Sequence, residues 1–435
     1  FLEAAVAAGA VAVASDAHGV RIAQAFGLPT IELADVRCGM ALLAAEVYGH
    51  PERELTMLGI TGTNGKTTTA SMVRHILREH KFNAGMIGTL GAWCGDEHLP
   101  GIRTTPESTD LFALLGYFRE HGTTHVVMEV SSHALTLGRV AGITFDVAAF
   151  TNLSQDHLDF HGDMDHYFAA KASLFDHANH GVINTDDVYG KALVDRCLGR
   201  IPLSTFGHDA DWSASKIQSQ VSGETTFDIT LPSGNEISVR IPMFGDFNVS
   251  NTLCALAVVS AIDVDIARAA ESLKTFGGVA GRCEIVSPSG RGTAVVDYAH
   301  TPDAVDKILA ELRAVNPRQL ITVIGCGGDR DPSKRFAMGR IASAHSDVVI
   351  VTDDNPRTED ATLIRQEVER GAREGSAHIL NVADRQLAIR EALTMANSGD
   401  IVAVLGKGHE SGQEVSGVVH PFDDRDVIRQ ESAHA

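Results

Sequence analysis

The sequence predicts an α/β protein of several domains, and three observations lead to this prediction. First, 435 residues exceed what one ordinary hydrophobic core holds, so about three domains are expected. Second, short apolar strands alternate with helical stretches through most of the chain, which is typical of βαβ units around a mainly parallel sheet. Third, a period-two pattern interrupts this alternation at residues 216–241, where a Ser-Gly-Asn turn indicates an antiparallel hairpin.

Three regions follow from these patterns, and we predict domains at residues 1–54, 55–283 and 284–435. The first region holds two short helix-strand units, at GAVAVAS and LPTIEL. The expected strands of the second region are LTMLGIT, AGMIG, HVVMEVSS, DVAAFTNLS and GVINTDD. The expected strands of the third region are TAVVDYA, QLITVIGC, DVVIVTDD, HILNVAD and DIVAVLGKG.

Composition excludes several functional classes. A net charge of −20 argues against binding nucleic acid, which needs a basic face, but it leaves nucleotides open. No stretch approaches 18 uninterrupted apolar residues, so membrane insertion is not expected. The apolar opening FLEAAVAAGAVAVAS suggests a signal peptide, but Glu3 and Gly9 interrupt the apolar run and no basic segment precedes it.

The cysteines indicate a reducing compartment. They are scattered, with no CxxC motif and no short spacing, which is typical of free thiols. We therefore predict a cytoplasmic protein. The six cysteines are Cys38, Cys94, Cys197, Cys254, Cys283 and Cys326.

The segment LGITGTNGKTTTAS, residues 58–71, predicts a phosphate-binding loop between a strand and a helix. Two glycines let the backbone curl so that its amides face a phosphate, Lys66 can reach the β- and γ-phosphates, and the hydroxyl of Thr67 can bind Mg²⁺. The loop is a variant, because Ile60 stands where the strict pattern has glycine. The residues expected to bind nucleotide here are Gly62, Thr63, Asn64, Gly65, Lys66, Thr67 and Thr68.

Oxygen ligands for a metal ion are expected nearby. Glu129 ends a predicted strand, and the segment that begins TNLSQDHLDFHG supplies His157 and, further on, Lys171. The His-x3-His spacing of HLDFH also allows a zinc site, although no third ligand stands at a suitable spacing. Taken singly, His157 is more typical of a structural histidine and Lys171 of a solvated charge.

Four strands of the third region end in charged, turn-rich segments: DYAHTPD, GCGGDRDPSKR, TDDNPRTED and GKGHE. In open α/β sheets, ligands bind at the carboxyl ends of the strands. Four such loops on one edge therefore predict a binding site.

Eight motifs in order resemble the Mur ligases, and the resemblance covers the chain from about residue 56 to its end. The motifs are TGTNGKTT, MEVSSHAL, TNLSQDHLDFHG followed by YFAAKASLF, GDFNVSN, VDYAHTPD, GCGGDRD, TDDNPR and GKGHE. The resemblance implies a three-domain architecture with a P-loop-type central ATPase domain and a Rossmann-like C-terminal domain. The first region is similar to only the second half of the family's N-terminal domain, so that domain is expected to be incomplete.

The resemblance is to the family members that add the third residue of the peptidoglycan stem peptide. It implies that ATP phosphorylates a carboxylate of UDP-MurNAc-L-Ala-D-Glu, that an incoming amine attacks the acyl phosphate, and that phosphate leaves. The implied cofactors are ATP and Mg²⁺, and the expected protein is a monomer.

The resemblance also carries residue roles over to this chain. It implies that Lys66, Glu129, His157 and Lys171 are catalytic, and that Lys171 is carbamylated, which converts an ammonium into an oxygen ligand. The implied Mg²⁺ ligands are Thr67, Glu129, His157 and Lys171. Further ATP contacts are Asn248, Arg282 and Asp297, and contacts to the UDP-sugar dipeptide are Thr104, Thr105, Ser131 and Arg139. Many relatives have glutamine where this chain has Leu137.

The third-position amino acid is predicted from Arg357 in TDDNPR. Meso-diaminopimelate differs from L-lysine by a distal carboxylate, which guanidinium forks bind bidentately. Arg330 would assist, and Glu410 would accept the distal ammonium. In the family, the DNPR motif marks the diaminopimelate enzymes. The whole predicted pocket is Arg330, Asp354, Asn355, Pro356, Arg357, Gly406 and Glu410. The alternative for Arg357 is an ion pair at a helix start with Glu359 or Asp360.

Three other functions share part of this motif set. Folylpolyglutamate synthase has a similar phosphate loop and mechanism but lacks the DNPR and GKGHE pair. A nucleotide-binding relative without ligase activity would be expected to lose Lys66, Glu129 or Lys171, and all three are present. The interpretation as a dinucleotide-binding dehydrogenase depends on the segment GCGGDR, where Arg330 replaces the last glycine of the G-x-G-x-x-G pattern.

Overall fold

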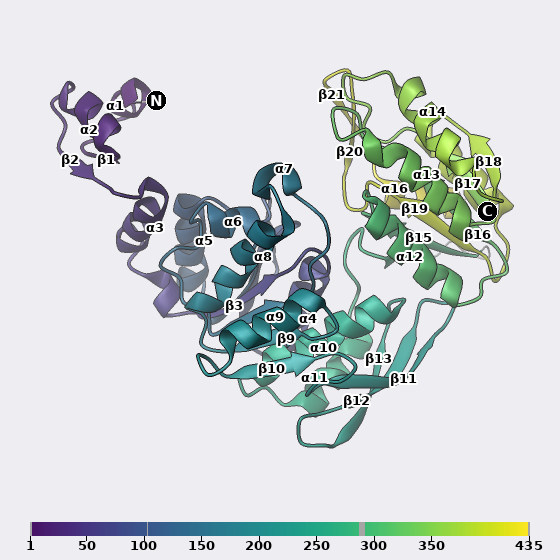
Figure 1. Ribbon diagram of the computed structural model, residues 1–435, viewed down its shortest axis with the longest axis horizontal. Helices are drawn as coiled ribbons and strands as arrows, with labels where there is room; N and C mark the ends of the chain where they lie inside the picture. The colour runs from purple at the N-terminus through teal and green to yellow at the C-terminus, as the bar shows by residue number, and fades with distance from the viewer. Residues whose placement is uncertain (1, 102, 287–291, 434–435) are drawn as a thin grey trace. The chain divides into compact units, whose positions relative to one another are not determined.

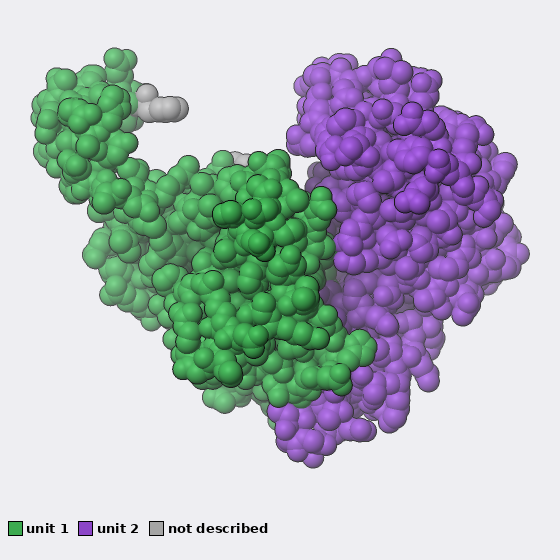
Figure 2. All heavy atoms as spheres, viewed as in Figure 1, with its two compact units in different colours: residues 1–212, 253–269 green, residues 213–252, 270–435 purple. Residues whose placement is uncertain are grey.

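The computed structural model describes residues 2–101, 103–286 and 292–433 (Figure 1). The chain divides into two compact units. Unit 1 comprises residues 1–212 and 253–269, and unit 2 comprises residues 213–252 and 270–435 (Figure 2). Helices α10 (Asp246–Ser260) and α11 (Ile266–Ser272) each contribute residues to both units.

An eight-stranded sheet forms the centre of unit 1, in the order β10-β9-β8-β3-β7-β4-β5-β6. The strands from β10 to β4 in that order are parallel, and β5 and β6 add antiparallel pairs at one edge. All five strands predicted for the second region are confirmed, as β3, β4, β7, β8 and β9. The strands are β3 (Thr56–Thr61), β4 (Ala84–Gly88), β5 (Gly91–Cys94), β6 (Glu97–Leu99), β7 (His125–Glu129), β8 (Val147–Phe150), β9 (Gly181–Asn184) and β10 (Leu203–Phe206).

Most helices of unit 1 bury one face, although the short helix at Leu158–His161 buries none of its residues. Helix α5, for example, buries Leu111, Phe112, Leu115 and Phe118, the spacing that makes an amphipathic helix. These side chains join the strand residues in one core. The helices are α4 (Lys66–Glu79), α5 (Ser108–Glu120), α6 (Ser132–Thr136), α7 (Leu158–His161), α8 (Met164–Ala172) and α9 (Val188–Cys197), with 3-10 turns η1 (Pro51–Arg53) and η2 (Ser173–His177).

The N-terminal part of unit 1 contains the two helix-strand units that the sequence predicts. Strands β1 and β2 pair in parallel, and helix α3 contacts helix α5. Asp35 starts α3 because its side chain accepts hydrogen bonds from the backbone amides of Arg37 and Cys38. The elements are α1 (Leu2–Ala7), β1 (Val13–Ser15), α2 (Ala17–Gln24), β2 (Thr30–Glu32) and α3 (Val36–Val47).

A six-stranded sheet forms the centre of unit 2, in the order β14-β15-β19-β16-β17-β18. All of its strands are parallel except β14. The five strands predicted for the third region are confirmed, as β15 to β19. The strands are β14 (Glu284–Ile285), β15 (Thr293–Asp297), β16 (Leu320–Ile324), β17 (Val348–Val351), β18 (His378–Asn381) and β19 (Ile401–Leu405).

Helices cover both faces of this sheet, which is why its central strands β19, β16 and β17 are buried along their whole length and almost entirely apolar. On one face of the sheet, Val295, Val349 and other strand residues that point the same way pack with helices α12 to α14. On the opposite face of the sheet, Val296, Ile350 and strand residues such as Val323 pack with α15 and α16. The helices are α12 (Pro302–Ala314), α13 (Ser333–His345), α14 (Ala361–Ala372), α15 (Arg385–Met395) and α16 (Asp424–Ala433).

Two smaller antiparallel sheets complete unit 2. The hairpin predicted at residues 216–241 is confirmed as β12 and β13, and β11 pairs beside it. The bounds are β11 (Ser213–Ser219), β12 (Thr225–Thr230), β13 (Glu236–Ile241), the 3-10 turn η3 (Leu273–Thr275), β20 (Gly412–Val415) and β21 (Val418–Pro421). Within the described part of the chain, no helix has the length and apolar character needed to cross a bilayer.

An ion pair inside unit 2 yields a prediction about stability. Arg385 and Asp424 are both fully buried and form two hydrogen bonds of 2.7 Å. Because Asp424→Asn leaves a buried guanidinium without its counter-charge, we expect the free energy of unfolding to fall by about 3–5 kcal/mol. Urea denaturation measures this. Asp426→Asn is the matched control, since Asp426 pairs with Arg429 at 2.9 Å in an exposed position and its loss should cost about 1 kcal/mol or less. Equal effects of the two substitutions would contradict the prediction.

Candidate active site

The phosphate loop predicted at residues 58–71 connects β3 to α4 in unit 1. Gly62 and Gly65 have φ of 146° and 86°, conformations that favour glycine. A Cβ added at Gly62 would lie 1.9 Å from Thr151 Oγ1, so the backbone passes too close to that side chain for any other residue. Helix α4 begins at Lys66, which leaves the amides of its first turn directed toward the loop. This geometry fits a phosphate group.

Neighbouring residues fix the rest of the loop. Thr63 Oγ1 lies 3.2 Å from the hydroxyl of Tyr167, and Asn64 N donates to Asn152 Oδ1 at 3.0 Å. Thr68 is buried in the first turn of α4. The loop is therefore ordered by contacts from the segment after β8 and from α8.

Two lysines meet at one carbonyl of this loop. Lys66 Nζ donates to Gly62 O at 3.0 Å, and Lys171 Nζ donates to the same oxygen at 2.7 Å. Lys171 is 2% exposed, and its Nζ lies 4.6 Å from the centre of the Tyr167 ring. Burial, and secondly the charge of Lys66, hold the pKa of Lys171 well below its ordinary value. Its amine is therefore far more often neutral than that of an exposed lysine.

Glu129 lies at the end of β7 and is fully buried. Its Oε2 accepts hydrogen bonds from Thr67 Oγ1 at 2.9 Å and Thr89 Oγ1 at 3.1 Å, and its Oε1 accepts one from Thr89 N at 2.9 Å. A Cβ at Gly88 would come within 2.2 Å of Oε1. A carboxylate and a hydroxyl this close supply the oxygen donors that Mg²⁺ prefers.

His157 precedes α7 with a φ of 53°. Its Nε2 lies 3.4 Å from Asp156 Oδ2, and its ring contacts the ring of His133 edge-on at 4.8 Å. His161, the other histidine of HLDFH, instead bonds to Ser132 Oγ at 2.9 Å. Across the described residues, no group of three or more His, Cys, Asp or Glu side chains has a metal-binding arrangement. The zinc alternative thus gains no third ligand, and magnesium binding by His157 stays a prediction.

The four residues predicted to contact the UDP-sugar dipeptide gather beside Glu129. Thr105 Oγ1 donates to Glu129 O at 2.8 Å and accepts from Ser131 N at 3.1 Å. Arg139 Nη1 donates to Thr105 O at 3.2 Å. Thr104 Oγ1 lies 3.0 Å from Thr89 Oγ1 and so connects to the Glu129 carboxylate. One network therefore joins the phosphate loop to these residues.

In unit 2, the four charged strand ends do lie on one edge of a sheet. Strands β15, β19, β16 and β17 are neighbours in that order and are parallel. The loops after β16 and β17 are bonded together, because Gly328 N donates to Asn355 O at 2.9 Å and Thr358 Oγ1 donates to Asp329 Oδ1 at 2.8 Å. The predicted convergence of these loops is confirmed.

Arg357 is held from two sides. Its Nη1 donates to Gly328 O at 2.7 Å, and its Nε lies 3.2 Å from Glu414 Oε2 in β20. Its backbone pairs with the same strand and adopts a φ of 52°, which is uncommon for a residue other than glycine. The alternative ion pair at a helix start is wrong: Glu359 pairs with Arg335, and Asp360 caps α14.

A second network surrounds a fully buried lysine, Lys407. Its Nζ donates to Asn355 Oδ1 at 3.0 Å and to Glu410 Oε2 at 3.2 Å, and lies 3.8 Å from Asp354 Oδ1. Asn355 Nδ2 also donates to Glu410 Oε2 at 2.8 Å. Because an ammonium only donates, Lys407 fixes which end of the Asn355 amide faces it. The predicted pocket residues Asp354, Asn355 and Glu410 are thus brought together.

The other predicted pocket residues lie on the same loops. Arg330 is exposed, and its Nη1 donates to the adjacent Asp329 O at 3.3 Å. A Cβ at Gly406, whose φ is 113°, would come within 2.5 Å of Asp354 Oδ2. Pro356 is buried between Asn355 and Arg357. A guanidinium, a carboxylate and an amide therefore share one edge, which suits an amino acid with charges at its far end.

The three residues predicted as further ATP contacts lie in unit 2. Asp297 accepts hydrogen bonds from Cys283 N at 2.7 Å and Ala299 N at 2.8 Å. The guanidinium carbon of Arg282 lies 4.8 Å from the centre of the Tyr298 ring. Asn248 Nδ2 donates to Phe244 O at 2.8 Å. Their contacts with ATP stay predictions.

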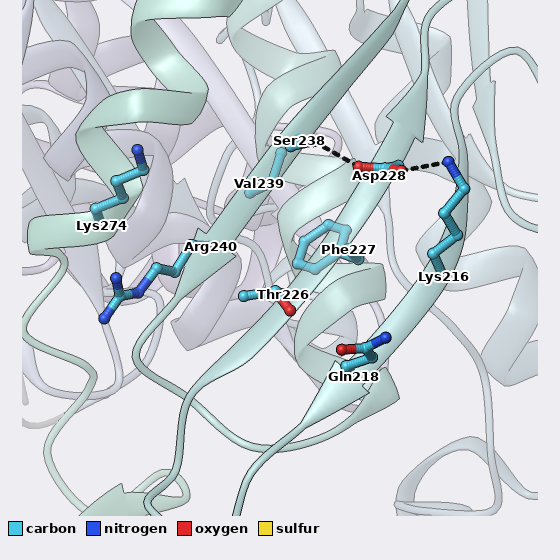
Figure 3. Close-up of a pocket in the computed structure, with 9 residues that line it drawn as sticks. All are labelled: Lys216, Gln218, Thr226, Phe227, Asp228, Ser238, Val239, Arg240 and Lys274. Carbon is cyan, nitrogen blue, oxygen red and sulfur yellow. Dashed lines mark hydrogen bonds and ion pairs between the residues drawn. The ribbon is translucent and has the colours of Figure 1, made fainter.

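A hollow of about 380 Å³ lies on the small sheet β11–β13, and none of the predicted site residues lines it. Figure 3 shows Asp228 between Lys216 and Ser238, with which it forms contacts of 2.7 and 2.6 Å. Arg240 and Lys274 also have acidic partners, Glu224 and Glu271. Because its charges are paired locally, this hollow offers no surplus charge to a ligand.

Sequence reasoning missed Thr89, Lys407 and Glu414. Lys407 stands inside the GKGHE motif, so the motif itself pointed to it. Glu414 lies 57 positions after Arg357 in an exposed hairpin, and no local pattern marks it. Thr89 follows β4 directly and could have been found as another strand end.

Comparison with protein families gives two matches. Residues 60–259 match the Mur ligase middle domain, and residues 281–408 match the domain described as Mur ligase, glutamate ligase domain.

Comparison with individual proteins agrees. The chain is 46% identical over 440 residues to the UDP-N-acetylmuramoyl-L-alanyl-D-glutamate–2,6-diaminopimelate ligase of Streptomyces coelicolor, covering 99% of this chain and 86% of the relative. It is 44% identical to the ligase of that name from Corynebacterium glutamicum, covering 97% and 84%. A solved structure of an enzyme with that name aligns with a TM-score of 0.73, 32% identity, and coverage of 99% and 88%. Mycobacterium tuberculosis folylpolyglutamate synthase shares the fold, with a TM-score of 0.70, 18% identity, and coverage of 91% and 94%.

Proposed function

This chain belongs to the Mur ligase family, and on that premise we propose that it joins meso-diaminopimelate to UDP-MurNAc-L-Ala-D-Glu in peptidoglycan precursor synthesis. The reaction is ATP-dependent and forms an amide, with ADP and phosphate as the other products. The choice of amino acid depends on Arg357, whose guanidinium is fixed at the same strand edge that carries Asn355 and Glu410. The three-domain division at residues 1–54, 55–283 and 284–435 remains part of this proposal.

ATP and Mg²⁺ fit the phosphate-loop region. The loop from Gly62 to Thr68 is shaped for phosphates, while Thr67 and Glu129 present oxygens 2.9 Å apart for the metal ion. When bound, ATP-Mg²⁺ supplies the phosphoryl group and the positive charge that offsets its oxygens. We assign Lys66 to the phosphates, Glu129, His157 and Lys171 to the metal ion, and Asn248, Arg282 and Asp297 to the nucleotide.

The chain's own residues position the two reacting groups. Thr104, Thr105, Ser131 and Arg139 hold the dipeptide so that its carboxylate oxygen can attack the terminal phosphorus of ATP, whose bond to the bridging oxygen breaks and releases ADP. The amine of diaminopimelate then attacks the carbonyl carbon, the bond from that carbon to the phosphate oxygen breaks, and phosphate leaves. Arg330 and Arg357 bind the distal carboxylate and Glu410 the distal ammonium, so that L-lysine would lack the carboxylate that the two guanidinium groups bind.

Lys171 is the proposed carbamate, and its surroundings support this. Carbon dioxide adds to a neutral amine, and burial lowers the pKa of Lys171. We expect a carbamate signal in NMR spectra recorded with ¹³C-bicarbonate, strengthening as pH rises because the neutral amine becomes more abundant, and disappearing on acidification. Lys171→Arg should abolish the signal, whereas Lys191→Arg, at an exposed position on α9, should leave it unchanged. A signal that survives Lys171→Arg would contradict the assignment.

The protein is proposed to act as a cytoplasmic monomer. All six cysteines are free thiols, as expected of a reducing compartment. Gel filtration with light scattering tests the oligomeric state.

Phosphate release tests the function itself. The protein is incubated with ATP, Mg²⁺, bicarbonate and UDP-MurNAc-L-Ala-D-Glu, with meso-diaminopimelate or L-lysine added separately. We expect release with diaminopimelate and not with lysine. Release with lysine alone would overturn the amino-acid assignment, and no release despite retained ATP binding would overturn the ligase assignment.

A further inference from the structure

Three arginines of unit 1 surround one glutamate. Glu107 Oε1 accepts hydrogen bonds from Arg103 Nη1 at 3.0 Å and Arg139 Nη2 at 2.7 Å. Its Oε2 accepts one from Arg37 Nη1 at 3.1 Å. Every ion pair recorded for these arginines in the described segments goes to this carboxylate. Three positive charges against one negative charge leave two in excess, in a chain whose net charge is −20.

The cluster borders the residues proposed to hold the UDP-sugar dipeptide. Arg103 and Glu107 flank Thr104 and Thr105 in sequence, and Arg139 also bonds to Thr105 O at 3.2 Å. Arg37 reaches the cluster from α3, which precedes the segment that carries the family motifs. Its helix lies close by, because a Cβ at Gly138 would be 3.4 Å from Cys38 N and 3.5 Å from Arg37 Cβ.

The arginines retain donors for a ligand. Each guanidinium has five N–H groups, and Glu107 occupies one on each arginine. The side chains of Arg37 and Arg103 are about half exposed, at 51% and 52%. That of Arg139 is 11% exposed, and its Nε is buried without a hydrogen-bond partner in the described structure. Ion pairs of such half-exposed side chains add about 1 kcal/mol or less to stability, so stability alone gives little reason to add Arg37 and Arg103 to the pair of Arg139 with Glu107.

We infer that Arg37, Arg103 and Arg139 together bind an oxyanion of the UDP-sugar dipeptide, with Glu107 aligning the three guanidinium groups. This inference rests on the proposed function and adds Arg37, Arg103 and Glu107 to its substrate site. The oxyanion is the diphosphate or a peptide carboxylate, both of which guanidinium forks bind through paired hydrogen bonds. A local positive surplus also attracts a multiply charged substrate to an otherwise acidic protein.

The test measures the Kd for UDP-MurNAc-L-Ala-D-Glu by calorimetry. Arg37→Gln and Arg103→Gln are each expected to raise it about tenfold, to weaken its dependence on salt, and to leave the Kd for ATP unchanged. The matched control is Arg119→Gln. Arg119 also ties the N-terminal part to α5, through Glu54 and Gly49 O at 3.0 Å, but it lies outside the cluster. The Arg119→Gln variant should therefore lower the thermal midpoint as much as Arg37→Gln does, but it should leave the Kd for the substrate unchanged.

A second ligand, MurNAc-L-Ala-D-Glu without the nucleotide, separates the two anions. If Arg37→Gln weakens binding of the complete substrate only, the cluster binds the diphosphate, and if it weakens both ligands, the cluster binds a carboxylate. Equal Kd values for wild type, Arg37→Gln and Arg103→Gln would overturn the inference while wild-type phosphate release leaves the proposed function standing. A wild-type protein that binds ATP but neither ligand would overturn both.

Discussion

Arg357→Ala is expected to lower kcat/KM for meso-diaminopimelate by about 100- to 1,000-fold while leaving the Kd for ATP unchanged. The guanidinium would bind the distal carboxylate by two charge-assisted hydrogen bonds, each contributing about 1.5–2 kcal/mol, the lower part of the usual range for such bonds. Steady-state phosphate release at varied diaminopimelate gives kcat/KM, and calorimetry gives the Kd for ATP. The loss should appear mainly in KM, because the distal carboxylate takes no part in the bond that forms.

The way in which Arg357 is held explains the size of this effect. Gly328 O and Glu414 Oε2 occupy Nη1 and Nε, so the side chain is oriented before substrate arrives. Its φ of 52° is a conformation that costs free energy for a residue with a Cβ. Such a conformation persists when surrounding contacts hold it, as the paired β20 strand does here.

Two control variants sharpen this test. Arg357→Lys keeps the charge but loses the planar fork, so we expect an intermediate loss of about tenfold. Arg340→Ala, on the exposed side of α13, should leave kcat/KM unchanged. Weaker ATP binding in Arg357→Ala, matching the loss for diaminopimelate, would show that the arginine supports the nucleotide site instead.

The strand edge around Arg357 could be predicted because its determinants are local. Uninterrupted apolar runs such as VVIV and IVAVL predict buried parallel strands, and parallel strands bring their carboxyl ends to one edge. The charged segments after β15, β16, β17 and β19 therefore had to converge. The same argument located Glu129 at the end of β7, beside the phosphate loop.

The partners of these residues could not be predicted, because they come from distant or irregular segments. The short hairpin β20–β21 is largely exposed, so no apolar pattern marks it, yet Glu414 in it pairs with Arg357. Glu359 and Asp360, the alternative partners of Arg357, lie nearer to it in sequence, but Arg335, 24 positions before Glu359, takes the Glu359 carboxylate. Sequence proximity is thus a poor guide where two loops of a sheet edge meet.

Lys171→Ala is expected to lower kcat by about 100- to 1,000-fold, a loss comparable to removing one group that stabilises transition-state charge. The fully buried Glu129 and the sheltered Lys171 would otherwise present oxygens to the metal ion, and alanine supplies none. ATP binding should persist, because Lys66 and the loop amides remain. Phosphate release under saturating substrates measures kcat, and Lys191→Ala, at an exposed position, is the control.

A rescue experiment separates an oxygen ligand from a role of the ammonium. Lys171 and Lys66 donate to the same carbonyl, Gly62 O, so only a protonated Lys171 would bring a second positive charge to the phosphate loop. If the ammonium were the active form, adding a methylamine cation to Lys171→Ala should restore phosphate release. If the carbamate is the active form, acetate or formate should restore it instead, because a small carboxylate can occupy the space left by the side chain. Rescue by the amine alone would contradict the carbamate. Rescue by the carboxylate and not by the amine would support it, and would agree with the low pKa that burial gives Lys171, because a neutral amine is the form that carbon dioxide modifies.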